Sequence, residues 1–151
     1  MQKITPFLWF DTQAEAAMNF YVSIFKNSRV LGITPGPNGK AMSVSFELEG
    51  QEFMALNAGP QFKFTEAISF FVNCETQEEV DDLWTKLPDE AQEGQCGWIK
   101  DKYGLWWQII PAALGELLGD KDAEKAGRVM NAMLQMKKID IRLLRQAYDQ
   151  K

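Results

Sequence analysis

The sequence of 151 residues contains no histidine. Catalysis by Ser-His-Asp or Cys-His arrangements is therefore excluded, as is general base catalysis by an imidazole. Zinc and non-haem iron sites that need an imidazole ligand are excluded for the same reason. One missing residue type thus removes much of common enzyme chemistry before any motif is considered.

Cysteine is also scarce. Its two copies, Cys74 and Cys96, have neither CxxC spacing nor another metal-ligand spacing. Cys74 falls within an apolar, strand-like run, which favours a buried and inert thiol over a nucleophile. Cys96 stands beside glycine. No secretory pattern follows Met1, so we expect a cytoplasmic protein.

Long basic runs are missing as well. The net charge is −5, and the longest notable basic cluster is the pair Lys137 and Lys138. We therefore expect neither nucleic acid nor an anionic membrane as a partner. With 46% hydrophobic residues, the chain has enough apolar material to bury a core as one domain or as two small modules.

What the sequence does contain is an internal repeat. The apolar run Ile4 to Leu8 precedes Thr12-Gln13-Ala14-Glu15, and the run Ile68 to Val72 precedes Thr76-Gln77-Glu78-Glu79 at the same separation. Both tetrapeptides have the pattern of a capping box, in which threonine and glutamate satisfy free N–H groups at a helix start. The pattern predicts a strand followed by a helix in each half.

The two predicted helices have apolar stripes at helical spacing. The first is expected over about 13–25, with its stripe at Ala17, Phe20, Tyr21, Ile24 and Phe25, and the second over about 77–87, with its stripe at Val80, Leu83, Trp84 and Leu87. Pro88 is expected to stop the second helix.

Strand patterns follow each helix. In the first half they cover 29–34, 42–49 and 52–56, with a tight turn at Gly50-Gln51. The second half offers 97–100, a turn at 101–104 and a last strand at 105–110. In the strand 42–49, apolar and polar residues alternate, which predicts one buried and one polar face. Glu47 and Glu49 are therefore interpreted as a solvated face.

The order βαβββ thus occurs twice, and the fold class is α+β. We expect the two repeats to form a curved, eight-stranded cup with a helical C-terminal extension. The predicted parts are a first βαβββ module at 1–58, a linker at 59–66, a second βαβββ module at 67–111 and the extension at 112–151. Phe62 and Phe64 on the linker are interpreted as a pocket rim or an interface.

The extension contains three helical patterns. Pro111 suits a first helical turn, Gly119 is a candidate left-handed C-terminal residue, and Asp140 is a candidate cap for the last helix. Met130, Met133 and Met136 form an adaptable apolar face. This face is expected to pack either on the protein's own sheet or on a second subunit.

These residues resemble the glyoxalase and bleomycin-resistance group of the vicinal oxygen chelate superfamily. The resemblance is carried by the segment Ile4 to Phe10, the helix Ala14 to Phe25 with Asn19-Phe20-Tyr21, and the segment Asp101 to Pro111. Within the group, the chain is similar to the PhnB-like branch, often labelled 3-demethylubiquinone-9 3-methyltransferase-like. The tail, with Glu124-Lys125, Arg128-Val129-Met130 and 136–140, resembles the ending of this branch, so the resemblance is expected to span essentially the whole chain.

The resemblance implies where a metal would be held. Metal-using relatives take ligands from the first and fourth strands of both repeats, and these positions correspond here to Thr5, Met54, Ser69 and Gln108. Two hydroxyls, an amide and a thioether compensate little of the cost of dehydrating a divalent ion. We therefore expect no metal.

The methyltransferase label implies S-adenosylmethionine as a cofactor. Such folds usually place a glycine-rich loop between a parallel strand and a helix. Gly32, Gly36 and Gly39 instead lie between strand patterns and are interpreted as turns. We expect no cofactor.

Three functional hypotheses remain. The first, which we favour, is a binding protein for a small apolar or aromatic molecule, as in the bleomycin-resistance relatives. Its candidate pocket residues are Thr5, Phe7, Trp9, Met54, Asn57, Phe62, Phe64, Ser69, Trp98, Trp106 and Gln108. The alternative for these aromatic residues is that they fill the concave side of the sheet.

The second hypothesis is an enzyme of the same superfamily, a lyase, dioxygenase or methyltransferase with an atypical site. It would use a metal or a carboxylate such as Glu15, Glu47 or Asp101. Glu15 and Asp101 also have local roles, in the first capping box and in the turn 101–104. The third hypothesis is a structural or interaction module, because relatives commonly form homodimers and open sheet edges attract partners.

Overall fold

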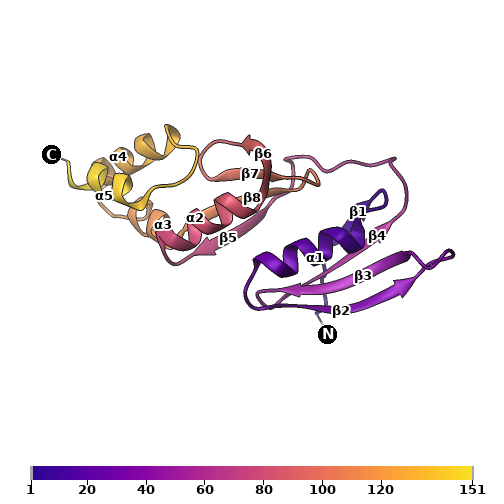
Figure 1. The fold of residues 1–151 in the computed structure, drawn as a ribbon. Coiled ribbons are helices and arrows are strands. Elements are labelled where there is room, and N and C mark those ends of the chain that lie inside the picture. Colours follow the sequence, from indigo (N-terminus) through magenta and orange to yellow (C-terminus); the bar gives the residue numbers. More distant parts are fainter. Residues whose placement is uncertain (1, 151) are drawn as a thin grey trace. The chain divides into compact units, whose positions relative to one another are not determined.

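Each half of the chain folds as β-α-β-β-β, as the internal repeat predicts (Figure 1). The structure, a computed structural model, describes residues 2–150, without the side chains of 89–93. The first repeat consists of β1 (Phe7–Phe10), α1 (Ala14–Ile24), β2 (Ser28–Pro35), β3 (Ala41–Leu48) and β4 (Gln51–Asn57). The second consists of β5 (Phe70–Cys74), α2 (Gln77–Lys86), β6 (Pro88–Glu93), β7 (Trp98–Asp101) and β8 (Trp106–Pro111). The α+β class is confirmed.

Two compact units, residues 1–63 and 64–151, make up the chain. Each contains one four-stranded sheet, in the order β1-β4-β3-β2 or β5-β8-β7-β6. The first and last strands of a repeat pair in parallel, and the other neighbours are antiparallel. Both sheets therefore have the same topology.

The strand register makes the two sheets comparable residue by residue. Phe7 lies beside Met54 in the first sheet, and Phe71 lies beside Gln108 in the second. Because Thr5 and Ser69 each stand two residues before these phenylalanines, the register pairs Thr5 with Ser69 and Met54 with Gln108. This is the pairing that the repeat in the sequence predicts.

One face of each sheet is buried against its helix. On β3 the buried side chains are Val44, Phe46 and Leu48, so the predicted alternation is confirmed. The Phe46 ring stacks at 5.4 Å from the Phe53 ring of β4 and at 6.3 Å from that of Tyr21 on α1. In the second unit the corresponding core contains Val80, Leu83 and Trp84 of α2 with Ile99, Trp107 and Ile109 of the sheet.

The two helices begin in different ways. Half of the expected capping box of α2 forms, because Thr76 Oγ1 accepts from Glu79 N at 3.2 Å. The Glu79 carboxylate accepts from Glu75 N, one residue before the cap, at 2.9 Å. The capping box expected for α1 is wrong. Its N-cap is Gln13 without a side-chain hydrogen bond. The amide oxygen of Asn57 on β4 accepts from Ala14 N at 2.9 Å and replaces the local cap.

A further correction concerns Pro88. The sequence predicts only that Pro88 ends α2, whereas the structure also begins β6 at this residue. The segment is acidic, and its pairing with β7 is irregular, with Pro88 beside Asp101 and Glu93 beside Ile99. Proline and charged residues are tolerated on an edge strand because one side needs no partner. For that reason the usual apolar strand pattern is missing.

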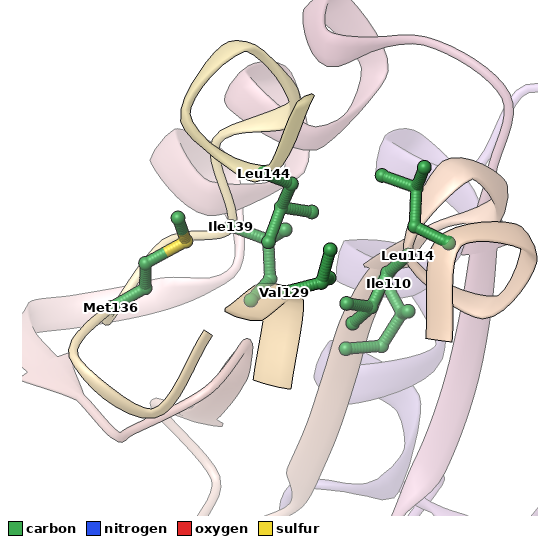
Figure 2. Packing of buried hydrophobic residues seen from close by; sticks show 7 residues of the cluster. Ile110, Leu114, Val129, Met136, Ile139 and Leu144 are labelled. Carbon is green, nitrogen blue, oxygen red and sulfur yellow. The ribbon is translucent and has the colours of Figure 1, made fainter. Parts of the chain in front are cut away.

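The C-terminal extension contains α3 (Ala112–Leu118), α4 (Ala123–Leu134) and α5 (Ile141–Asp149). Asp140 caps α5 as predicted, through Leu143 N at 3.1 Å. Gly119, in contrast, has a φ of −82° and is not left-handed as predicted. The helices share one buried cluster: Ile110, Leu114, Leu117, Val129, Met136, Ile139 and Leu144 (Figure 2). Ile110 belongs to β8, so the extension packs on its own unit.

Polar contacts also attach the extension to the second repeat. The Gln77 side chain donates to Ile139 O at 2.9 Å and accepts from Ile141 N at 2.7 Å. The backbone N–H groups of Cys96 and Gly97 donate to Met136 O and Lys137 O. The expected methionine face is divided: Met136 is buried, whereas Met130 is exposed.

Candidate functional site

Each sheet has a second face that its own helix does not cover. In the second unit we define the second-repeat face as the side chains that alternate with the buried ones: Ser69, Phe71, Trp98, Lys100, Trp106 and Gln108. The equivalent first-repeat face consists of Thr5, Phe7, Ser45, Glu47, Glu52 and Met54. These two faces contain most of the predicted pocket residues.

The second-repeat face is aromatic with a polar pair in it. The rings of Trp98 and Trp106 meet at 6.3 Å in an edge-on arrangement. Gln108 Nε2 donates to Ser69 Oγ at 3.0 Å. Phe71, directly beside Gln108, is 60% exposed. The structure therefore brings four predicted residues together and adds Phe71.

Sequence reasoning missed Phe71 although a signal was available. The repeat pairs Phe71 with Phe7, which is on the list of candidates, and both are exposed in the structure. Phe71 lies on the edge strand β5, and an exposed phenylalanine there marks a candidate binding surface because other aromatic side chains stand on the same face.

The first-repeat face carries fewer aromatic residues. Phe7 is 53% exposed beside Met54, and Thr5 Oγ1 accepts from Gln2 Nε2 at 3.5 Å. Trp9, farther along β1, donates from Nε1 to Gly59 O at 2.9 Å. The exposed ring of Phe62 meets the Trp9 ring at 4.8 Å. Phe62, interpreted from the sequence as a pocket rim or interface residue, thus packs on the candidate pocket residue Trp9.

Two predicted pocket residues have other positions. Asn57 lies on the helix side of its sheet, where its amide oxygen caps α1 and its amide nitrogen donates to Ala41 O at 3.0 Å. We therefore correct its expected place among the pocket residues to a structural role. Phe64 is half-buried at the start of the second unit, before β5.

Two of the three carboxylates considered for catalysis are engaged elsewhere. Asp101 is 3% exposed and accepts from Tyr103 N, Leu105 N and Trp107 Nε1 at 2.8–3.0 Å. The expected role of Asp101 in the turn 101–104 is thus confirmed. Glu47 Oε1 lies 3.5 Å from Arg29 Nε, and Glu15 is exposed in the first turn of α1. Burial, reinforced by Glu79, raises the pKa of the Cys74 thiol to about 12, which makes it a poor nucleophile.

Comparison with known proteins gives the family. A family model described as 3-demethylubiquinone-9 3-methyltransferase matches residues 2–110. A PhnB protein from Bacillus cereus, described with the same methyltransferase name, is 40% identical with a TM-score of 0.68, over 74% of this chain and all of that chain. The chain belongs to this family. Among curated proteins, none matches the chain.

More distant structures share the fold. Protein PA1353 from Pseudomonas aeruginosa is 17% identical with a TM-score of 0.61, over 74% of this chain and 98% of that chain. A glyoxylase/bleomycin resistance protein/dioxygenase domain from Frankia sp. EAN1pec is 14% identical with a TM-score of 0.46, over 74% and 92%. Of these two, PA1353 shows that the fold extends beyond proteins of similar sequence.

The family match ends at residue 110, just before α3. The expectation that the resemblance spans essentially the whole chain is therefore wrong for this family model, which leaves out the C-terminal helices. No helix among the described residues has the length and apolar character needed to cross a bilayer.

A metal does not fit the positions that the fold family implies. Thr5 and Met54 offer a hydroxyl and a thioether, and Ser69 and Gln108 already bond to each other. Neutral ligands of this kind compensate poorly for the lost water shell of a divalent ion. Within the described part of the chain, no three His, Cys, Asp or Glu residues are grouped as a metal site.

S-adenosylmethionine fits equally poorly despite the family name. The turns from β1 to α1 and from β5 to α2 contain no glycine, whereas a nucleotide cofactor needs a close backbone approach there. The strand after each helix also lies at the far edge of its sheet and not beside the first strand. We therefore derive no methyl transfer for this chain.

Proposed function

We propose that this family member is a metal-independent binding protein for a small, mostly apolar or aromatic molecule, which it does not transform. The observation that carries the proposal is the aromatic second-repeat face, with Phe71 exposed beside Trp98, Trp106 and the Ser69–Gln108 pair. Ligand sites typically combine apolar walls with a few polar groups that orient the ligand.

The energetics agree with a binding surface. An aromatic side chain can bury about 150–250 Å² of surface, and stacking adds about 0.5–1.5 kcal/mol to that burial. A flat aromatic ligand placed on Phe71 and Trp106 would gain both contributions. The Ser69–Gln108 pair would fix its orientation without placing a net charge on the face.

An enzyme is less well supported. Asp101 is held by three hydrogen bonds, Glu47 faces Arg29, and the pKa of Cys74 is raised. None of these groups is prepared to move a proton or attack a substrate near neutral pH. Binding is therefore the function that these side chains support best.

The proposal is tested with the full chain and a panel of aromatic and hydrophobic compounds. Tryptophan fluorescence and melting temperature are measured with and without EDTA, and the compounds are recovered for mass analysis. We expect at least one aromatic compound to change the fluorescence, raise the melting temperature regardless of EDTA, and return unchanged. A silent panel, a requirement for metal or a converted compound would contradict the proposal.

We further propose that the chain forms a homodimer through a sheet edge. The edge strand β2 exposes Leu31 and Ile33, and an uncovered apolar edge favours pairing with another strand. Light scattering of the full chain should give the mass of a dimer. Ile33→Lys should shift it toward the monomer, whereas Thr85→Lys on exposed α2 should not. A monomeric mass for the unmodified chain would contradict this proposal.

A further inference from the structure

We propose that Gly94 positions the ring of Trp106 as a platform on the second-repeat face, and that this platform selects flat aromatic molecules over saturated ones of the same size. The inference rests on the proposed binding function and deepens it by naming the class of ligand. Its basis is that the Trp106 ring occupies the space that a side chain at position 94 would need.

Gly94 directly follows the edge strand β6 and lies beside Trp98 of β7, because Gly94 N donates to Trp98 O at 2.9 Å. A Cβ atom added at Gly94 would lie 3.2 Å from Cζ3 of the Trp106 ring. It would also lie 3.1 Å from Cβ of Trp98 and 2.8 Å from the Trp98 carbonyl oxygen. Carbon atoms pack best at about 3.5–4.0 Å, so a methyl group here would displace the ring or the strand.

This contact requires the Trp106 ring to lie along the sheet. Trp106 belongs to β8, and β7 separates β8 from the strand that ends before Gly94. Neighbouring strands are about 4.8 Å apart, so the ring bridges about two strand spacings and cannot stand upright on β8. On its way it meets the Trp98 ring, with centroids 6.3 Å apart and planes at 62°. Trp106 is half-buried, so the ring is supported by the sheet and still reaches solvent.

The first repeat has a glycine at the equivalent place, beside a serine. Gly32 of the edge strand β2 pairs with Ser45, which the register makes equivalent to Trp98. A Cβ atom at Gly32 would meet Ser45 Oγ at 3.4 Å, an ordinary contact. In the place of Trp106 this repeat has Glu52. Neither glycine has a positive φ, so alanine suits the backbone at both positions and only the neighbours differ.

A ring that lies along the face favours a flat ligand. Aromatic pairs that are offset-stacked or edge-to-face gain free energy beyond the burial of their area. A saturated ring of the same size buries similar area, but it is puckered and has no π-system to make this gain. The gain corresponds to about five-fold in the dissociation constant. Phe71, exposed in the adjacent row beside Gln108, offers a second ring to the same ligand.

The test compares 2-naphthol with trans-decahydro-2-naphthol, which share a carbon skeleton and a hydroxyl group, on the full chain. Dissociation constants are measured by calorimetry. We expect the unmodified chain to bind naphthol about five-fold more tightly. Trp106→Leu removes the platform and Gly94→Ala displaces it, so each should reduce the preference to less than about two-fold. Gly32→Ala is the matched control and should retain it.

A double variant separates the ring from the strand. Added to Trp106→Leu, Gly94→Ala should change naphthol binding less than about two-fold further, because the ring through which it acts is gone. A larger further loss would overturn the inference. If Gly94→Ala alone does not fold, Trp106→Leu should restore folding by removing the clashing ring, and a double variant that stays unfolded would overturn the inference as well.

The two proposals fail in different ways. Equal affinity of the unmodified chain for the two compounds would overturn the platform and leave the proposed binding function intact. A preference that survives in Trp106→Leu or Gly94→Ala would do the same. Equal losses in Gly94→Ala and Gly32→Ala would also overturn the platform, since they would indicate a general effect on edge strands. If neither compound nor any member of the wider panel bound, both proposals would fail.

Discussion

The two sheets share strand order and register, yet the side chains on their uncovered faces differ at every equivalent position outside Phe7 and Phe71. Ser45, Glu47 and Glu52 of the first repeat correspond to Trp98, Lys100 and Trp106 of the second. One face is acidic with a paired charge, and the other is aromatic with a lysine at the position of Glu47. The common backbone therefore fixes positions, while the side chains make the two faces chemically different.

The helix starts differ in the same way. Asn57 and Pro111 are equivalent in the register, since Phe10 pairs with Asn57 and Cys74 with Pro111. Asn57 caps α1 from the neighbouring strand, whereas Pro111 has no side-chain donor or acceptor and α2 uses its own Thr76. One repeat thus depends on a tertiary contact for a task that the other performs locally.

The largest expected effect comes from the turn between the last two strands of each repeat. In the second repeat, Asp101→Ala removes the acceptor of three hydrogen bonds. Each buried donor left unsatisfied costs about 1–3 kcal/mol, so we expect a loss of about 3–5 kcal/mol in urea unfolding. In the first repeat, Gly50→Ala, at a φ of +86°, should cost about 1–2 kcal/mol. A loss for Asp101→Ala no larger than this would contradict the prediction.

The next largest effect on stability concerns the glutamines Gln13 and Gln77, which follow the equivalent residues Thr12 and Thr76. Gln77→Ala removes the hydrogen bonds to Ile139 and Ile141 and should lower the free energy of unfolding by about 2 kcal/mol. Hydrogen exchange at Ile141 should rise at the same time. Gln13→Ala is the matched control, because Gln13 is exposed and makes no side-chain cap, and it should stay within about 0.5 kcal/mol. Similar losses for the two variants would refute the anchoring role of Gln77.

A smaller difference is expected between the two helix caps. Asn57→Ala loses the bonds to Ala14 N and Ala41 O and should cost about 1–2 kcal/mol. Thr76→Ala loses one cap bond and should cost about 1 kcal/mol. Urea unfolding of both variants measures the difference. An unchanged stability of Asn57→Ala would show that the tertiary cap contributes nothing.

The smallest expected effect is on ligand binding, and it distinguishes the equivalent residues Phe7 and Phe71. Phe71→Ala should weaken the binding of an aromatic compound from the panel about five-fold, as expected for one lost aromatic contact. Phe7→Ala removes the same side chain from the first-repeat face and should change binding less than about two-fold. Fluorescence titration measures both. Equal weakening would mean that the ligand also contacts the first-repeat face.

Much of the architecture was predictable because its signals are local. Three signals lie within single elements: the apolar run before a threonine in each half, the apolar stripe on α2, and the alternation of apolar and polar residues on β3. The same repeat pairs Thr5 with Ser69 and Met54 with Gln108, as the strand register does. Most residues of the second-repeat face were also named as candidates from the sequence, although the function of this face as a binding site stays a proposal.

Other features were not predictable from local patterns. The strand β6 was missed because an edge strand carries an acidic sequence without alternation. Asn57 was wrongly assigned to the pocket. Its partners Ala14 and Ala41 lie 43 and 16 positions away in the sequence, so no local pattern indicates its bonds to them. Gly119 was given a left-handed conformation that its helix end does not need.

The sequence by itself determined the two related halves, the alternation that buries one face of β3, and the absence of histidine. These follow from composition and from the periods of strands and helices. Only the tertiary structure decided which polar side chains are used within the fold, such as Asn57 and Gln77. The reason is physical: hydrogen bonds and ion pairs depend on distances of a few ångströms between residues far apart in the sequence.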